Sequence, residues 1–266
     1  MIEPDNFSEH PVDVPATPAA TVVVFRRDPQ GGQPQVLLVE RAQSMAFAGG
    51  ATVFPGGKID PADHALAQAS AAGDDDALMD IAARIAAVRE TLEETGLVIG
   101  IAEQVSAMQA VEARQMLLDQ GDLGAVLQAF GWTLALDRLV PFARWWPRHR
   151  LRRVFDTRFY LADLGTGAVD IAVDATENRH LFWASAAEAL RLADEGAISV
   201  IFPTRRNLER IAGFADFAAC AQHARTTPMV TITPRIEERD GRRWLVIPAD
   251  AGYPVDGEPL DDAQRG

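Results

Sequence analysis

The chain carries three glutamates within one stretch of five residues, Glu90, Glu93 and Glu94. On a helix, the spacings i, i+3 and i+4 place all three carboxylates on one face. Like charges at this spacing repel, so we expect a cation to neutralise them. Mg²⁺ prefers hard oxygen ligands and commonly joins carboxylates to substrate phosphates. The spacing therefore indicates a divalent-metal site for a phosphate-containing ligand, although an isolated pattern of this kind is more often a solvated helix face.

The helix that must position these carboxylates is indicated by its apolar residues. They recur at spacings of four, three and four, which places them on one stripe: Ile81, Ile85, Val88 and Leu92. The acidic residues at 74–76 can cap the start of this helix, and Gly96 predicts its end. One helix thus offers an apolar face to a core and an acidic face to a ligand.

The rest of the chain alternates between short strand-like and helical segments, which predicts an α/β or α+β sandwich. The expected strands are residues 21–25, 35–40, 51–55, 98–101, 139–146, 153–164 and 181–183. Further helices are expected near 65–71, over 103–130 with a break at 121–124, and at 186–194 and 203–214. Segments 229–238 and 242–247 flank Asp240-Gly241, a strong hairpin signal.

These segments suggest three parts. Residues 1–18 are expected to form a disordered tail, and residues 19–214 one domain with insertions at about 64–78 and 103–136. Residues 215–266 form a C-terminal extension that contains the hairpin and ends in loop.

Composition limits the kinds of partner. The formal net charge is -13 over 266 residues, with a pI near 4.8, which argues against general affinity for nucleic acid because that affinity requires clustered Lys and Arg. Cys220 is the single cysteine, so no intrachain disulfide can form. No stretch approaches the roughly 20 apolar residues that span a bilayer, and residues 1–18 lack the features of a signal peptide. We expect a cytoplasmic monomer or homodimer with no membrane partner.

The segment from Gly57 to residue 97 resembles the Nudix box. That pattern is Gly, five residues, Glu, seven residues, then Arg-Glu-apolar-x-Glu-Glu-x-Gly-apolar, and residues 89–97 read Arg-Glu-Thr-Leu-Glu-Glu-Thr-Gly-Leu. Asp63 stands at the first Glu position, residues 64–88 fill the gap of seven, and Thr91 takes the apolar position. A surface insertion in this gap is tolerable because loop-closure entropy rises slowly with loop length.

The resemblance implies a Nudix-type α/β/α sandwich with a mixed sheet and a site for Mg²⁺ or Mn²⁺. The metal ligands would be the carbonyl group of Gly57 and the carboxylates of Glu90, Glu93 and Glu94. Arg89 would pair with a carboxylate of the box and fix its rotamer.

The resemblance also implies that water attacks phosphorus directly, without a covalent nucleophile. Glu90 and Glu94 would be direct metal ligands, whereas Glu93 would bind a second metal or deprotonate the water. Glu177, on a loop before Trp183, is a further candidate base or metal ligand, and its alternative is an exposed loop glutamate.

Longer stretches resemble a Nudix branch that includes peroxisomal coenzyme A diphosphatases and bacterial relatives. The stretches that carry this resemblance are 37–41, 54–57, the interrupted box, 155–159 and Trp183. Arg41, Gly50 and Phe54 fit the coenzyme A pattern of this branch, while Ala46 occupies its internal Arg position.

This branch implies a small-molecule nucleoside diphosphate derivative as substrate, with coenzyme A or acyl-coenzyme A first. The alternatives are cleavage of ADP-ribose or a dinucleotide, or a catalytically silent Nudix domain that senses a ligand.

One basic cluster stands out in the acidic chain, within residues 144–153 and beside Trp145 and Trp146. It either receives the phosphates and adenine of a substrate or is a solvated loop next to core tryptophans, and both readings remain open. The residues expected to bind substrate are Arg41, Lys58, Arg144 and Arg158.

Overall fold

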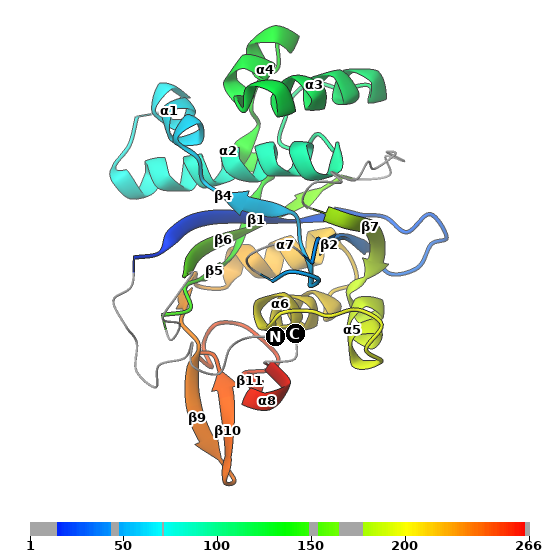
Figure 1. The fold of residues 1–266 in the computed structure, drawn as a ribbon, viewed down its shortest axis with the longest axis vertical. Coiled ribbons are helices and arrows are strands. Elements are labelled where there is room, and N and C mark those ends of the chain that lie inside the picture. Colours follow the sequence, from blue (N-terminus) through cyan, green and yellow to red (C-terminus); the bar gives the residue numbers. More distant parts are fainter. Residues whose placement is uncertain (1–14, 44–47, 71, 149–153, 165–177, 264–266) are drawn as a thin grey trace.

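The computed structural model describes residues 15–43, 48–70, 72–148, 154–164 and 178–263. Eight strands form one mixed sheet that lies between two layers of helices, α1 to α4 on one face and α5 to α7 on the other (Figure 1). A smaller sheet, formed by β9 to β11, lies beyond the second layer (Figure 1). The predicted sandwich with a mixed sheet is therefore confirmed.

Strand β1 (Thr17–Arg26) runs through the middle of the large sheet. Val22 and Val24 point into one apolar core, and Val23 and Phe25 point into the core on the opposite face. Strands that are apolar on both faces are typical of a sheet covered on both sides. β1 begins two residues before the predicted start of ordered structure at residue 19.

The partners of β1 position the rest of the sheet. β6 (Phe155–Asp163) pairs with β1 in parallel, while β2 (Gln35–Arg41) and β4 (Gly56–Lys58) pair with it antiparallel. The predicted hairpin of β1 and β2 is present, although only two residue pairs form it, whereas β2 pairs along its whole length with β7 (Asn178–Ser185). The order across the sheet is β3-β2-β1-β6-β5-β8.

Three short strands complete this sheet: β3 (Thr52–Val53), β5 (Val140–Trp145) and β8 (Thr231–Ile232). β8 was predicted as part of one strand over 229–238, but Pro234 interrupts that segment because proline has no N–H for a ladder. β8 instead pairs in parallel with β5 in the large sheet.

Helix α2 (Asp75–Thr95) is the centre of the first helical layer. The side chain of Asp74 accepts a hydrogen bond from the N–H of Ala77 at 2.9 Å, and Gly96 ends the helix with φ 74°. Both caps were predicted. Ile85, Val88 and Leu92 are buried in the core, with Ile81 at its edge, and four further buried residues let α2 approach the sheet closely: Ala82, Ala83, Ala86 and Ala87.

The segments predicted as insertions flank α2. They form α1 (Pro61–Ser70), α3 (Ala107–Gln120) and α4 (Leu123–Phe130), followed by the short 3-10 helix η2 (Leu136–Arg138). The predicted strand over 98–101 is wrong, because this segment makes a single bridge between Ile101 and Leu134.

The second layer contains α5 (Ala186–Asp194), α6 (Phe202–Ala212) and α7 (Phe217–Thr226). Ser185 caps α5 as predicted. The sequence reading missed α7, whose apolar stripe consists mostly of small residues: Phe217, Cys220, Ala221 and Ala224. Among the described residues, no helix combines the length and apolar composition needed to cross a membrane.

The C-terminal part forms the predicted hairpin, β9 (Arg235–Arg239) and β10 (Arg242–Val246), around Asp240 and Gly241, which both have positive φ. The following residues were predicted to be loop, but they contain β11 (Gly257–Pro259) and α8 (Leu260–Ala263). The division of the chain at residue 214 stays a prediction.

Shortening Ile85 tests how much the packing of α2 contributes to the fold. Ile85→Ala should lower the free energy of unfolding by about 2–5 kcal/mol, because the side chain is 0% exposed and its removal leaves a cavity. Urea unfolding measures this change. Met108→Ala is the control, since Met108 is 70% exposed and its removal should cost under about 0.5 kcal/mol. Equal effects of the two variants would contradict the packing described here.

Candidate active site

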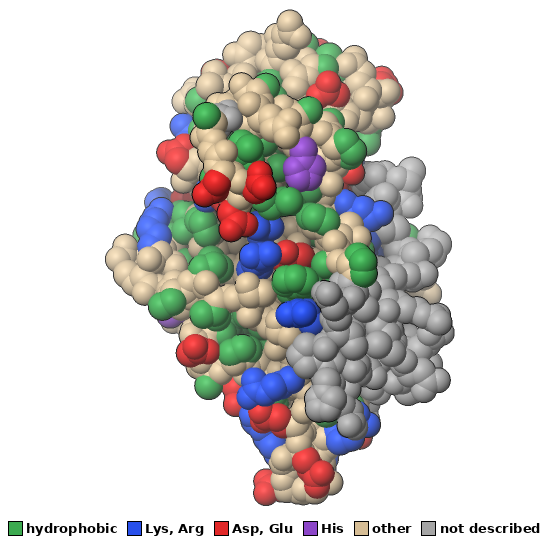
Figure 2. Space-filling view, turned by 90° about the vertical axis from the view of Figure 1, so that its left-hand side faces the viewer, with side chains coloured by type: hydrophobic (Ala, Val, Ile, Leu, Met, Phe, Trp, Pro, Cys, Tyr) green, Lys and Arg blue, Asp and Glu red, His purple; other side chains and the backbone are tan. Residues whose placement is uncertain are grey.

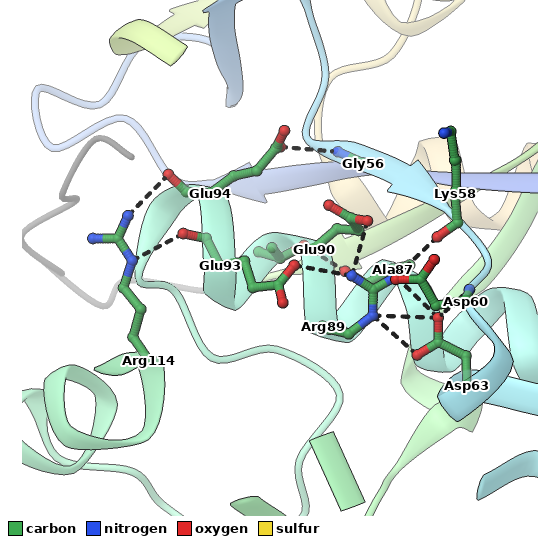
Figure 3. Close-up of polar contacts among 11 residues, drawn as sticks. Gly56, Lys58, Asp60, Asp63, Ala87, Arg89, Glu90, Glu93, Glu94 and Arg114 are labelled. Atoms are coloured by element: carbon green, nitrogen blue, oxygen red, sulfur yellow. Dashed lines mark hydrogen bonds and ion pairs between the residues drawn. The ribbon is translucent and has the colours of Figure 1, made fainter. Parts of the chain in front are cut away.

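The acidic face of α2 lies against β4 (Figure 3). The N–H of Gly56 donates a hydrogen bond to Glu94 Oε2 at 3.1 Å. Gly57 lies so close to Glu90 that a Cβ on it would be 2.2 Å from Glu90 Oε1. A side chain at this position would therefore displace the carboxylate of Glu90.

Arg89 connects the acidic face to the neighbouring elements, and its side chain is only 3% exposed. Its Nη1 donates to Glu90 Oε1 and to Glu93 Oε2, both at 2.9 Å. Its Nη2 donates to the carbonyl of Lys58 at 2.8 Å and to Asp63 Oδ2 at 2.9 Å. One guanidinium thus fixes two of the three glutamates relative to β4 and α1 (Figure 3).

Asp63 is the partner of Arg89 for which the sequence reading gave no contact. It is 1% exposed, and both of its oxygens accept hydrogen bonds from Arg89 Nε, at 3.1 and 3.2 Å. Asp63 Oδ2 also accepts from the N–H of Asp60, which fixes the first turn of α1. The available signal was its place in the box pattern, six residues after Gly57.

Burial sets the charge state of this cluster. Burial raises the pKa of Glu90 to about 8; Arg89 opposes the rise, whereas the charges of Glu94 and Glu93 add to it. Burial also raises the pKa of Glu93 against the effect of Arg89. Both shifts reflect first the cost of burying a charged carboxylate, and the attraction of Arg89 offsets only part of that cost.

The carboxylates are engaged with protein groups in the structure. Within the described residues, no three His, Cys, Asp or Glu side chains converge into a metal-binding group. The physical reason is that Arg89 lies between Glu90 and Glu93, while Glu94 is directed to the N–H of Gly56.

Two of the four residues predicted to bind substrate share one row of the sheet with Gly57. Gly57 and Arg158 flank Ala20 of β1, and Arg144 is the next residue in the row. Cross-strand partners point to the same face, and Ala20 packs into the core beneath α2, so both arginines belong to the α2 face.

The two arginines differ in their pairing. Arg144 makes two hydrogen bonds to Asp156, at 2.8 and 2.6 Å. Arg158 makes no hydrogen bond or ion pair with any residue that the structure describes. Figure 2 looks onto the side of the molecule that carries α1, and there Lys and Arg side chains follow one another beneath a group of acidic side chains.

The side chains of the other predicted site residues do not contact the carboxylate cluster or lie outside the described residues. The side chain of Lys58 points away from the carboxylates, and only its carbonyl takes part in the cluster (Figure 3). Arg41 lies at a bulge of β2, and its Nε is buried without a hydrogen-bond partner. Glu177, Ala46 and the basic segment 149–153 lie outside the described residues.

Arg114 of α3 is a second contact that the sequence reading missed. Its Nε donates to the carbonyl of Glu93 at 2.9 Å, and its Nη2 to the carbonyl of Glu94 at 3.4 Å. No motif indicates it, because it lies in an insertion 21 residues from Glu93.

Residues 16–120 match the family model described as NUDIX domain. The crystal structure of a NUDIX hydrolase from Alicyclobacillus acidocaldarius matches with a TM-score of 0.65 at 26% identity, over 79% of this chain and 97% of that chain. No curated protein matches the chain.

Two further structures have lower similarity. The MutT protein from Methanosarcina mazei Go1 has a TM-score of 0.40 at 16% identity, over 75% of this chain and 95% of that one. The NUDIX domain of Shewanella oneidensis NrtR, complexed with ADP ribose, has a TM-score of 0.39 at 17% identity, over 74% of this chain and 86% of that one. The family match and the first structure identify residues 16–120 as a NUDIX domain within a chain that has the fold of the NUDIX hydrolases.

Proposed function

We propose that this chain is a divalent-cation-dependent hydrolase that cleaves the diphosphate linkage of a nucleoside diphosphate joined to another group. The observation that carries the proposal is the cluster of Glu90, Glu93 and Glu94 packed against Gly56 and Gly57. The alternative interpretation of these glutamates is a helix face exposed to solvent. Such a face would not bury its glutamates against a glycine backbone.

The donor set fits Mg²⁺ or Mn²⁺. Carboxylate oxygens are the hard ligands that these ions prefer. The absence of a side chain at Gly57 leaves backbone and carboxylate in direct contact, and a cation there would offset the cost of burying the charge of Glu90. Glu90 and Glu94 are our proposed direct ligands, together with the carbonyl of Gly57.

Each group of the cluster then has a task. When bound, the cation supplies positive charge against the diphosphate oxygens and activates water. Arg89 holds Glu90 and Glu93 in fixed rotamers. Glu93 is 21% exposed and has a raised pKa, so we propose that it accepts a proton from the attacking water. The water oxygen bonds to one phosphorus, the bridging P–O bond breaks, and two phosphorylated fragments leave.

Basic residues supply the other half of substrate recognition. Arg158 on the α2 face, which pairs with none of the described residues, and the buried, unpartnered Nε of Arg41 are our candidates for binding anionic groups of the substrate. A buried donor without a partner costs free energy, and an anionic ligand would offset that cost. Arg144 is a weaker candidate because Asp156 already pairs with it.

Coenzyme A or acyl-coenzyme A is our first choice among substrates. The support is the sequence resemblance at 37–41, Gly50 and Phe54, with Ala46 as its departure from the pattern. ADP-ribose and dinucleotides contain the same linkage and differ in the group attached to it.

Replacing Glu94 tests the assignment of the cluster. Glu94→Gln should lower turnover at least about a hundredfold, because it removes one charge that positions the cation. Steady-state rates at saturating Mg²⁺ measure this. Glu112→Gln, on the exposed face of α3, is the matched control and should retain wild-type turnover. Near-wild-type turnover of Glu94→Gln would show that the metal assignment is wrong.

Replacing Glu90 tests the electrostatics of the cluster without substrate. The folded-state pKa of Glu90 lies above its ordinary value, so the folded protein holds an extra proton between about pH 4.5 and 8. This contribution to stability is complete below about pH 4.5 and is lost as the pH rises to about 8.

Glu90→Gln removes this titration. In EDTA at pH 8.5, the variant should be more stable than the wild type by roughly 1–3 kcal/mol, and the difference should shrink toward pH 5. Thermal unfolding at several pH values measures it, with Glu112→Gln as control. A Glu90→Gln protein that is less stable at every pH would rule out this account.

A substrate panel tests the proposed reaction itself. The protein is incubated with Mg²⁺ and coenzyme A, an acyl-coenzyme A, ADP-ribose or a dinucleotide, and the product masses are measured. We expect two phosphorylated fragments from coenzyme A, and fragments from another compound alone would reassign the substrate. Tight binding without fragments from any compound would indicate a ligand sensor and refute catalysis.

A further inference from the structure

We propose that Arg114 is a positioning residue, through which the inserted helix α3 holds the last turn of α2 and with it the carboxylates of Glu93 and Glu94. The inference rests on the proposed function and deepens it. It assigns to the helical insertion a part in building the site.

The first step is the chemistry of a helix end. The last four carbonyls of an α-helix have no donor within the helix. In α2, the N–H of Gly96 satisfies the carbonyl of Leu92 at 2.9 Å. Arg114 donates to the next two carbonyls, those of Glu93 and Glu94. A guanidinium at this end also complements the negative end of the helix dipole.

The second step is the rigidity of the support. Helix α3 begins with a capping box of Ser106 and Gln109 and ends at Gly121, which has positive φ. Its residues Ala110, Ala113 and Leu117 are buried, the last two in the apolar core on the α2 side of the sheet. Arg114 therefore reaches α2 from a fixed position (Figure 3).

The third step links this contact to the site. The turn that Arg114 holds carries Glu94, which accepts from the N–H of Gly56, and Glu93, which accepts from Arg89. If that turn frays, both carboxylates lose their positions relative to β4. Partners of this indirect kind typically change metal affinity or activity 10- to 100-fold when mutated.

The test compares three variants of the full-length chain. Arg114→Met removes the contact. Arg114→Lys keeps the positive charge but lacks the guanidinium that donates to two carbonyls at once. Arg138→Met is the matched control, because Arg138 donates to the carbonyl of Ile101 at 2.6 Å but not to α2. Hydrogen exchange over residues 90–97 reports the last turn, and EPR titration with Mn²⁺ alone reports the carboxylates.

We expect Arg114→Met to exchange faster over 90–97 and to bind Mn²⁺ at least about tenfold more weakly. Arg114→Lys should be intermediate, and Arg138→Met should match the wild type. Unchanged exchange, or unchanged Mn²⁺ affinity despite faster exchange, would overturn the proposal, as would an equal loss in Arg138→Met.

If Arg114→Met does not fold, Arg114→Lys is compared with the wild type instead. Its hydrogen exchange over 90–97 and its Mn²⁺ affinity are then judged by the same criteria. A wild-type protein that binds no Mn²⁺ would overturn the proposed function and the positioning of metal ligands, whereas hydrogen exchange would still show whether Arg114 holds the turn.

Discussion

The buried guanidinium of Arg89 is the interaction on which the acidic cluster depends. It donates hydrogen bonds to side chains or backbone of α1, β4 and α2, so one charged side chain connects three elements. A buried ion pair adds little net stability, but losing one of its members leaves an uncompensated charge in the interior. The arrangement therefore fixes geometry more than it stabilises the fold.

The stability for this arrangement comes from the other side of α2. Its alanines and the stripe through Ile85 bury apolar surface against β1, while its outer face concentrates like charges. The two faces have opposite effects on the stability of the fold, because burial of the apolar stripe raises it and burial of Glu90 lowers it. Such a conflict between stability and local charge is common where binding groups are prepared in advance of their ligand.

Much of the fold could be predicted because its signals are local. Asp74, Gly96 and Ser185 mark helix ends, and Asp240-Gly241 marks a hairpin, each through the conformation or hydrogen bond of a single residue. The strand predicted at 98–101 failed because an apolar run alone does not show whether a neighbouring strand is available.

The site was predictable only in part. Spacing along one helix placed Glu90, Glu93 and Glu94 together, and this needed no knowledge of the fold. The partners that hold them differ in this respect. Asp63 lies 26 residues from Arg89, but its place in the box pattern was a signal. Nothing in the sequence indicates Arg114, 21 residues from Glu93, because its contact depends on how two helices pack.

The link between Asp63 and Arg89 also bears on how chains of this kind are found. The two halves of the box are joined through space by a hydrogen-bonded pair, so the number of residues between them is not constrained by the site. A pattern with a gap of fixed length passes over such a chain. A search that lets the gap vary, and accepts Asp as well as Glu before it, follows the chemistry more closely.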